Sequence, residues 1–148
     1  MLGFGDNFKQ RIKLLKRFNL SSTLETHFAE HMDGRIWKEG EVVTREGDVG
    51  DSMFFLHSGH LKVFKKGDDD QDVEIAEMKS GDFFGEIALL KGNPRTSTVI
   101  VDKESFIYEL RWKDIKFLIN SNHQLEQQLH TALMIRVEND EKQLNNMG

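Results

Sequence analysis

The stretch GDFFGEIALLKGNPRTSTVIV, residues 81–101, decides how this chain is interpreted. It is apolar enough to be buried core, yet it carries Glu86 and Arg95, with Gly92 and the only proline of the chain between them. Charged side chains are seldom buried without partners. The stretch therefore predicts a binding site as well as a piece of the core.

The local pattern predicts what this site binds. A strand that ends at Phe84, a turn at Gly85 and a helical turn over 87–90 would leave free backbone N–H groups, the usual way in which proteins hold phosphate. The returning strand brings back Arg95, whose guanidinium can form paired hydrogen bonds to phosphate oxygens. Glu86 would repel phosphate and instead suits a ribose hydroxyl. The expected ligand is a compact phosphate with a free ribose hydroxyl beside it.

The chain around this stretch divides into three segments. Helical spacing over 6–32, with Ser21, Ser22 and Thr23 as candidate N-caps, predicts two short helices in an N-terminal helical segment, 1–35. Short β-rich runs between glycine turns predict an antiparallel roll or barrel over 36–110. Helix formers then predict a short helix near 112–120 and a longer terminal helix within 111–148. The fold class is mainly β with flanking helices, in one domain.

Composition limits the classes of function. The 148 residues have a net charge of −5, which argues against nucleic acid as a partner. There is no cysteine and no apolar run long enough to span a membrane, and the N-terminus lacks a secretory signal, so we expect a soluble, cytoplasmic protein or cytoplasmic domain. The basic helix with Phe8, Ile12 and Leu15 is expected to pack its apolar stripe on the domain rather than on a membrane.

Two segments together resemble a known family. FFGEIALLKGNPRTSTV is similar to the phosphate-binding cassette of cyclic nucleotide-binding domains, and EGEVVTREGDVGDSMFFLHSGHLKVF, residues 39–64, is similar to the strand pair upstream of it. Kinase regulatory subunits, cyclic nucleotide-gated channels and catabolite-activator-type regulators share this domain. The resemblance covers roughly residues 12 to 140. It implies an antiparallel β-roll or jelly roll (a double-stranded β-helix) with the phosphate-binding cassette at 84–99, N-terminal helices and a C-terminal lid helix.

The resemblance also implies roles for individual residues. Arg95 would pair with the cyclic phosphate, Glu86 would accept from the ribose 2′-OH, and Gly85 would let the ligand approach. The remaining implied contacts are the N–H groups of Ile87 and Ala88 on phosphate oxygens, Thr96 near the phosphate or base, and Val63 against the ribose or base. The terminal helix would close over the purine, with Arg136 as the first candidate for the capping residue and Leu133 as the second.

The function implied is a switch without chemistry of its own. Family frequency favours cAMP over cGMP, and Thr96 permits cGMP without requiring it. The ligand would organise residues 84–96, Leu89 or Leu90 would shift, the short helix near 112–120 would follow, and the terminal helix would close. We expect no catalysis, no metal and no cofactor besides the cyclic nucleotide. The expected partner is an effector domain or protein, with a channel or other multidomain receptor ahead of a stand-alone sensor.

Three alternatives stay open at this point. Glu86 and Arg95 could form a structural ion pair, or the fold could serve assembly or bind another anion. The third alternative is a metal-dependent cupin-like enzyme; among six histidines only His57 and His60 fall together in the roll, on an expected turn at Gly59, without a third ligand. The acidic run at 65–74 is interpreted as a hairpin tip and not as a calcium loop.

Overall fold

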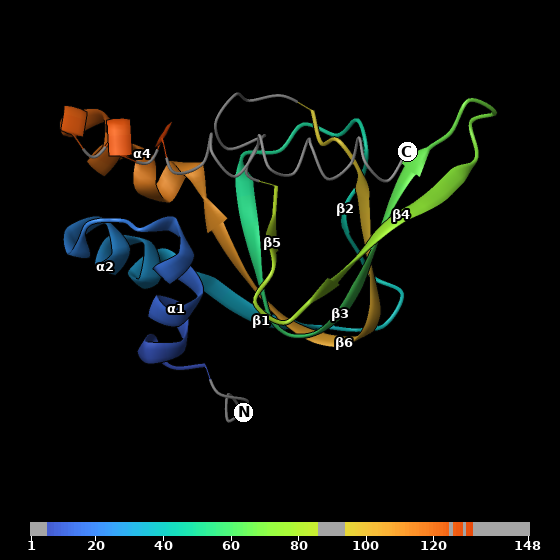
Figure 1. The fold of residues 1–148 in the computed structure, drawn as a ribbon, viewed down its shortest axis with the longest axis horizontal. Coiled ribbons are helices and arrows are strands. Elements are labelled where there is room, and N and C mark those ends of the chain that lie inside the picture. The colour runs from blue at the N-terminus through green and yellow to red at the C-terminus, as the bar shows by residue number, and fades with distance from the viewer. Residues whose placement is uncertain (1–5, 86–93, 125, 129, 132–148) are drawn as a thin grey trace.

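The structure is a computed structural model that describes residues 6–85, 94–124, 126–128 and 130–131. Helices occupy one side of the molecule and strands the other (Figure 1). The elements in chain order are α1 (Phe8–Leu15), the 3₁₀ helix η1 (Lys16–Phe18), α2 (Ser22–His31), β1 (Asp33–Trp37), β2 (Val42–Thr44), β3 (Ser52–Lys66), β4 (Asp72–Lys79), β5 (Phe83–Phe84), β6 (Thr98–Arg111) and α4 (Trp112–Ser121).

The strands form one antiparallel sheet that bends back on itself. Its order is β1-β6-β3-β4, with β2 added on β6 and β5 on β3. The two long strands, β3 and β6, pair from Ser52↔Arg111 to Phe64↔Thr98, with shifts in register between Leu56 and Leu61. Phe54 and Ile107 lie before the register shifts along β3, and Val99 pairs beyond them. All three nevertheless pack in one cluster, because the sheet bends at the shifts. This is the β-roll with flanking helices that the sequence predicted.

Two strands are longer than expected, and in β3 the reason is that Gly59 forms a bulge and not a turn. The runs on either side of Gly59 were predicted as separate strands, but β3 continues through it, and β6 likewise joins two predicted runs. Gly59 has φ 119°, and a Cβ there would overlap Ser105. The expectation that His57 and His60 lie on a turn is therefore wrong, since both belong to β3. A paired strand can absorb a positive-φ glycine where its ladder shifts register.

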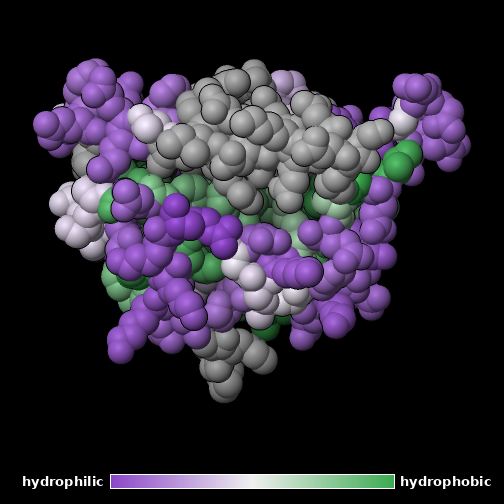
Figure 2. Space-filling model, viewed as in Figure 1, coloured by the Kyte–Doolittle hydropathy of each residue, from purple (hydrophilic) through white to green (hydrophobic). Residues whose placement is uncertain are grey.

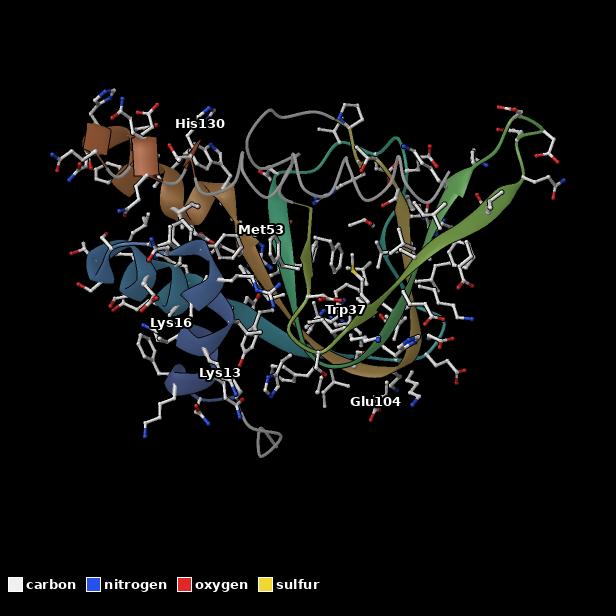
Figure 3. The ribbon with its side chains drawn as sticks, in the orientation of Figure 1. Lys13, Lys16, Trp37, Met53, Glu104 and His130 are labelled. Carbon is white, nitrogen blue, oxygen red and sulfur yellow. The ribbon has the colours of Figure 1, made fainter. Side chains whose placement is uncertain are left out.

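Two cores lie on opposite faces of the β1-β6-β3 part of the sheet. The inner core fills the roll and includes Trp37, while the outer core, which includes Met53, packs against the helices. Figure 3 labels both residues, with Trp37 among the strands and Met53 at the side of the helices. The alternation of inward and outward residues along β3 and β6 produces this division.

The N-terminal helices begin at the caps that their sequence provides. Asn7 accepts from the Gln10 N–H at 3.0 Å, and Ser21, a predicted N-cap, accepts from the Leu24 N–H at 3.3 Å. Leu15 is fully buried in the outer core. Phe8 differs from the expectation, because it leaves 46% of its surface exposed beyond the first turn that packs. The apolar stripe of α1 thus starts one turn later than its sequence indicated.

The remaining segments lie as follows. β1 begins at Asp33, slightly inside the segment expected to be helical, because residues 33–37 pair with β6. The helix predicted near 112–120 is α4. Residues 123–124, 126–128 and 130–131 are helical, while the apolar stripe predicted for the terminal helix falls outside the described residues. No helix in the described part of the chain is long and apolar enough to cross a membrane.

The acidic run at 65–74 is the tip of the β3–β4 hairpin. Residues 67–71 form the turn, which projects from the roll and is hydrophilic (Figures 1 and 2). The Gly67 N–H donates to the Gln71 carbonyl at 2.8 Å, which closes the turn. Within the described residues no group of three or more histidine, aspartate or glutamate side chains is arranged to hold a metal ion. The antiparallel pairing of β3 with β4 on either side of the turn confirms that this run is a hairpin tip.

Candidate functional site

The two motif segments of the sequence meet at Arg95. The Arg95 N–H donates to the Asp48 carbonyl at 2.7 Å, and the Gly47 N–H donates to the Arg95 carbonyl at 2.9 Å. Pro94 forms an isolated bridge with Val49 beside them. The glycine-containing loop before β3 therefore holds the backbone on which Arg95 stands.

The guanidinium of Arg95 is held by the start of β3. Its Nη1 donates to the Ser52 carbonyl at 2.7 Å and to the Gly85 carbonyl at 3.3 Å, and its Nη2 contacts the Ser52 hydroxyl oxygen at 3.2 Å. Its Cζ lies 5.6 Å from the centre of the Phe54 ring. We call Gly50, Ser52, Phe54 and Gly85 the Arg95 seat. The seat fixes the positive charge of Arg95. Through the Gly85 carbonyl it also brings the beginning of the predicted cassette next to Arg95, which lies toward its end.

Two glycines make room for this guanidinium. A Cβ at Gly50 would overlap Arg95 at Nε, Nη2 and Cζ. A Cβ at Gly85 would lie 2.7 Å from Arg95 Nη1 and 2.9 Å from the Ser52 carbonyl oxygen, and Gly85 has φ 86°, a conformation that favours glycine. Gly85 was expected to let a ligand approach, and that role stays a prediction. In the structure the missing side chain of Gly85 makes room for Arg95.

A chain of polar contacts continues from the seat across the sheet. The Ser52 hydroxyl donates to Glu109 Oε2 at 2.8 Å, and Arg111 Nη2 donates to Glu109 Oε1 at 3.0 Å. The same Arg111 nitrogen donates to Asp33 Oδ2 at 3.1 Å, and this hydrogen bond raises the pKa of Arg111. The contacts link β3, β6 and β1 to the residue that precedes α4.

A cavity of about 610 Å³ opens beside Arg95. Its wall is formed by the segment around β2, the loop before β3, and the beginning of β3. Ser52, Glu109 and Arg95 all line it. Acidic and basic side chains thus share one hollow at the end of the roll.

The other residues predicted for the site are distributed as follows. Val63 is 5% exposed and belongs to the core inside the roll, and Thr96 is exposed directly after Arg95. Neither lines the cavity. The predicted contacts at Glu86, Ile87, Ala88 and Arg136 lie outside the described residues, as do Leu89, Leu90 and Leu133. Of the predicted residues, the structure brings Gly85 and Arg95 together.

Sequence reasoning missed Gly50, Ser52 and Glu109. One signal for Glu109 was present: in SFIYEL it alternates with Ile107, so a carboxylate faces the same side of the strand as core residues. No comparable local signal marks the Ser52 side chain, because its partners come from residues far along the chain. Gly50 belongs to the segment 39–64 that resembles the family, but this segment does not indicate that Gly50 lies against Arg95.

His60, one of the two histidines weighed as metal ligands, lies between two carboxylates. Its Nδ1 is 2.9 Å from Asp102 Oδ2 and its Nε2 is 3.3 Å from Glu77 Oε2. Both ring nitrogens therefore face carboxylates from neighbouring strands, which ties β3 to β6 and β4. This arrangement is a structural contact between strands and does not resemble an open facial triad.

The fold and site define a class: a β-roll domain that holds an arginine in a fixed position beside a cavity. The comparison with family models identifies the family. Residues 35–122, more than half of the chain, match the model described as cyclic nucleotide-binding domain. The chain belongs to this family.

Individual relatives agree with this assignment. A cAMP-dependent protein kinase regulatory subunit from Blastocladiella emersonii is 29% identical over 133 residues, which is 90% of this chain and 31% of that protein. A cyclic nucleotide-gated potassium channel from Rhizobium etli is 34% identical over 102 residues, 69% of this chain and 27% of that protein. The chain thus spans less than a third of the length of either relative.

Solved structures show the same fold. A cyclic nucleotide-binding domain from Methylobacillus flagellatus has a TM-score of 0.82 at 17% identity, over 94% of this chain and 80% of that one. The catabolite activator protein of Thermus thermophilus has a TM-score of 0.70 at 20% identity, over 90% of this chain and 62% of that one. At these identities the likeness establishes the β-roll and its flanking helices.

Proposed function

We propose that this chain binds a cyclic nucleotide and acts as a ligand-operated regulatory domain. The observation that carries the proposal is the Arg95 seat, in which two carbonyls, a hydroxyl and two glycines fix a guanidinium beside the end of β5. A fixed guanidinium is suited to paired hydrogen bonds with a phosphate. Arg95 pairs with the cyclic phosphate in this proposal.

The other contacts of the proposed complex follow the family pattern. Glu86 accepts from the ribose 2′-OH, the N–H groups of Ile87 and Ala88 hold phosphate oxygens, and Gly85 lets the ligand approach. Thr96 contributes a hydroxyl near the phosphate or base, and its exposure directly after Arg95 is compatible with this role. Val63 lies against the ribose or base, and Arg136 caps the purine.

We expect cAMP to be preferred over cGMP. Several relatives carry the name cAMP-dependent protein kinase regulatory subunit. Thr96 could serve the guanine amino group, but it is not specific for it. The preference therefore rests on the relatives and not on a hydrogen bond to the base.

The regulated effector is an attached domain or a separate protein, with a channel or other multidomain receptor as the first expectation. The named relatives include kinase regulatory subunits and a channel, and the chain covers only part of each. In the proposed switch the ligand orders the cassette, α4 follows, and the terminal helix closes over the base. A ligand can shift two states only by its difference in affinity for them.

Calorimetric titration with cAMP, cGMP and 5′-AMP tests the proposal. The 5′ nucleotide keeps base and ribose but lacks the cyclic phosphodiester. Binding of a cyclic form at micromolar or lower Kd, with 5′-AMP much weaker, supports the proposal and identifies the preferred base. If neither cyclic form gives heat or a thermal shift, the proposal fails, and an assembly role or another anion at Arg95 takes its place.

A further inference from the structure

We propose that Ser52 and Glu109 are positioning residues for Arg95, which fix its guanidinium before a ligand arrives. The inference rests on the proposed function for its consequence in binding, but its geometry is independent of any ligand. Ser52 accepts from Arg95 twice, through its carbonyl from Nη1 at 2.7 Å and through its hydroxyl from Nη2 at 3.2 Å. One residue thus holds both terminal nitrogens of the guanidinium.

Glu109 determines which way the Ser52 hydroxyl points. A guanidinium can only donate and an ionised carboxylate can only accept, while a hydroxyl has one hydrogen and two acceptor lone pairs. The hydroxyl therefore places its hydrogen on Glu109 Oε2, 2.8 Å away, and turns a lone pair toward Arg95. Without Glu109 the hydroxyl could rotate, and its acceptor position at Nη2 would no longer be fixed.

Glu109 is itself held in place from the opposite side. Its second oxygen accepts from Arg111 at 3.0 Å, and Arg111 is shared with Asp33 at 3.1 Å. Ser52 is 3% exposed and Glu109 has 28% of its side chain exposed, so little water competes for the serine contact. The orienting contacts thus run from the Asp33–Arg111 pair through Glu109 and Ser52 to Arg95.

The consequence is a guanidinium with few rotamers left to lose. Immobilising a flexible side chain on binding costs affinity, and a side chain that is already fixed avoids that cost. Loss of the Ser52 hydroxyl should therefore weaken cyclic nucleotide binding about two- to tenfold, the range expected for one freed side chain. The opposite expectation holds if Ser52 competes with the ligand for Arg95, because Ser52→Ala would then bind more tightly.

A mutant cycle tests whether Ser52 acts through Arg95. Kd values for cAMP are measured by calorimetry for the wild type, Ser52→Ala, Arg95→Lys and the double variant. We expect Ser52→Ala to lower affinity two- to tenfold in the wild-type background and to have no effect in the Arg95→Lys background, because a lysine ammonium does not present the paired nitrogens that Ser52 holds. An equal loss in both backgrounds, an unchanged Kd or tighter binding would overturn the proposal.

Glu109→Ala is measured in the same two backgrounds. This substitution also removes a negative charge that opposes anion binding in either background, so the difference between the two backgrounds reports positioning. We expect Glu109→Ala to lower the affinity for cAMP more when Arg95 is present, and to cause no additional loss of affinity once Ser52→Ala is made.

The matched control is Ser105→Ala, the other buried serine of the described core. Ser105 contacts the His60 N–H and the Lys103 carbonyl, so its loss should change stability and not Kd.

A measurement without ligand separates this proposal from the proposed function. In the ligand-free protein, NMR signals of the Arg95 guanidinium, assigned by their loss in Arg95→Lys, should show separate Nη1 and Nη2 groups because rotation about Nε–Cζ is restricted. Ser52→Ala should speed the exchange between these groups, because it removes a contact of Nη2 while the carbonyl contacts of Nη1 stay, whereas Ser105→Ala should not. Averaged signals in the wild type would overturn the positioning role even if cAMP binds. Restricted signals with no binding of any cyclic nucleotide would uphold positioning and reject the proposed function.

Discussion

Arg95 is the residue on which the proposed function depends most directly. Its guanidinium is partly buried among carbonyls, where a bound phosphate would meet a fixed positive charge. Arg95→Ala should weaken cyclic nucleotide binding by about 2–5 kcal/mol, because the phosphate would lose its buried charge partner. Calorimetry measures the Kd, and circular dichroism checks that the roll is intact. Binding within threefold of the wild type would show that Arg95 is not the phosphate residue.

Gly50 allows a purely steric test of the same seat. Gly50→Ala would place a methyl group onto the guanidinium, and should displace Arg95 and reduce affinity at least tenfold while the roll stays folded. Gly67→Ala is the matched control, because the nearest atom to its new Cβ is 3.3 Å away, in Val73 at the hairpin. Equal affinities for the two variants, measured by cAMP titration, would contradict the assigned geometry.

A site residue could be predicted from the sequence only where its contact partners lie close to it in the chain. The proximity of Arg95 and Gly85 could be predicted because both belong to one motif of neighbouring residues. Ser52 and Glu109 could not, because they meet only after β3 and β6 pair with Ser52 opposite Arg111. A pattern of neighbouring residues predicts turns and helix caps well, but it does not predict contacts across strands.

At the scale of elements, the bend of β3 at Gly59 shapes the roll. Gly59→Ala would combine an unfavourable positive φ with overlap at Ser105, and should lower the free energy of unfolding by more than about 2 kcal/mol. Ser58→Ala, at an exposed position of the same strand, should change it by less than about 0.5 kcal/mol. Denaturant unfolding measures both, and equal stabilities would mean that the bulge tolerates a side chain.

The same glycine explains why the elements were predicted only in part. A glycine with positive φ marks a hairpin turn or a bulge inside a strand, and the two have the same local signature. Pairing decides between them: His60 and Lys103 lie opposite each other on the continuous ladder, so the chain passes through Gly59 without reversing. The starts of helices were easier to predict from the sequence, since Ser21 caps α2 through a contact with Leu24, only three residues away.

At the scale of the whole molecule, the N-terminal segment is tied to the last core strand. The Tyr108 hydroxyl donates to Asp6 Oδ1 at 2.7 Å across 102 positions of sequence, and Arg11 pairs with the same carboxylate at 3.1 Å. Arg11 also donates to the Ala29 carbonyl at 3.0 Å, which includes α2 in the contact. The helices and the roll are thereby joined by polar contacts as well as by the outer core.

This junction predicts an alkaline pH dependence that one spectroscopic signal can follow. Burial, and after it the hydrogen bond to Asp6, raises the pKa of Tyr108 above the ordinary tyrosine value. Because the unfolded chain ionises first, the stability from this group is complete below pH of about 10 and is lost as pH rises toward the folded pKa. Tyr108 is the only tyrosine, so tyrosinate absorbance reports it alone.

We expect the folded wild type to form tyrosinate only well above pH of about 10, and Asp6→Asn to form it at lower pH, because the charge and part of the hydrogen bond are lost. Asp48→Asn, which alters a carboxylate elsewhere on the surface, is the control and should titrate like the wild type. Identical titrations of Asp6→Asn and the wild type would mean that Asp6 does not hold Tyr108 in solution. The polar connection between the N-terminal helices and the roll would then rest on the arginine contacts, Arg11 over the Tyr108 ring and Arg17 over the Phe83 ring, and not on the Asp6 carboxylate.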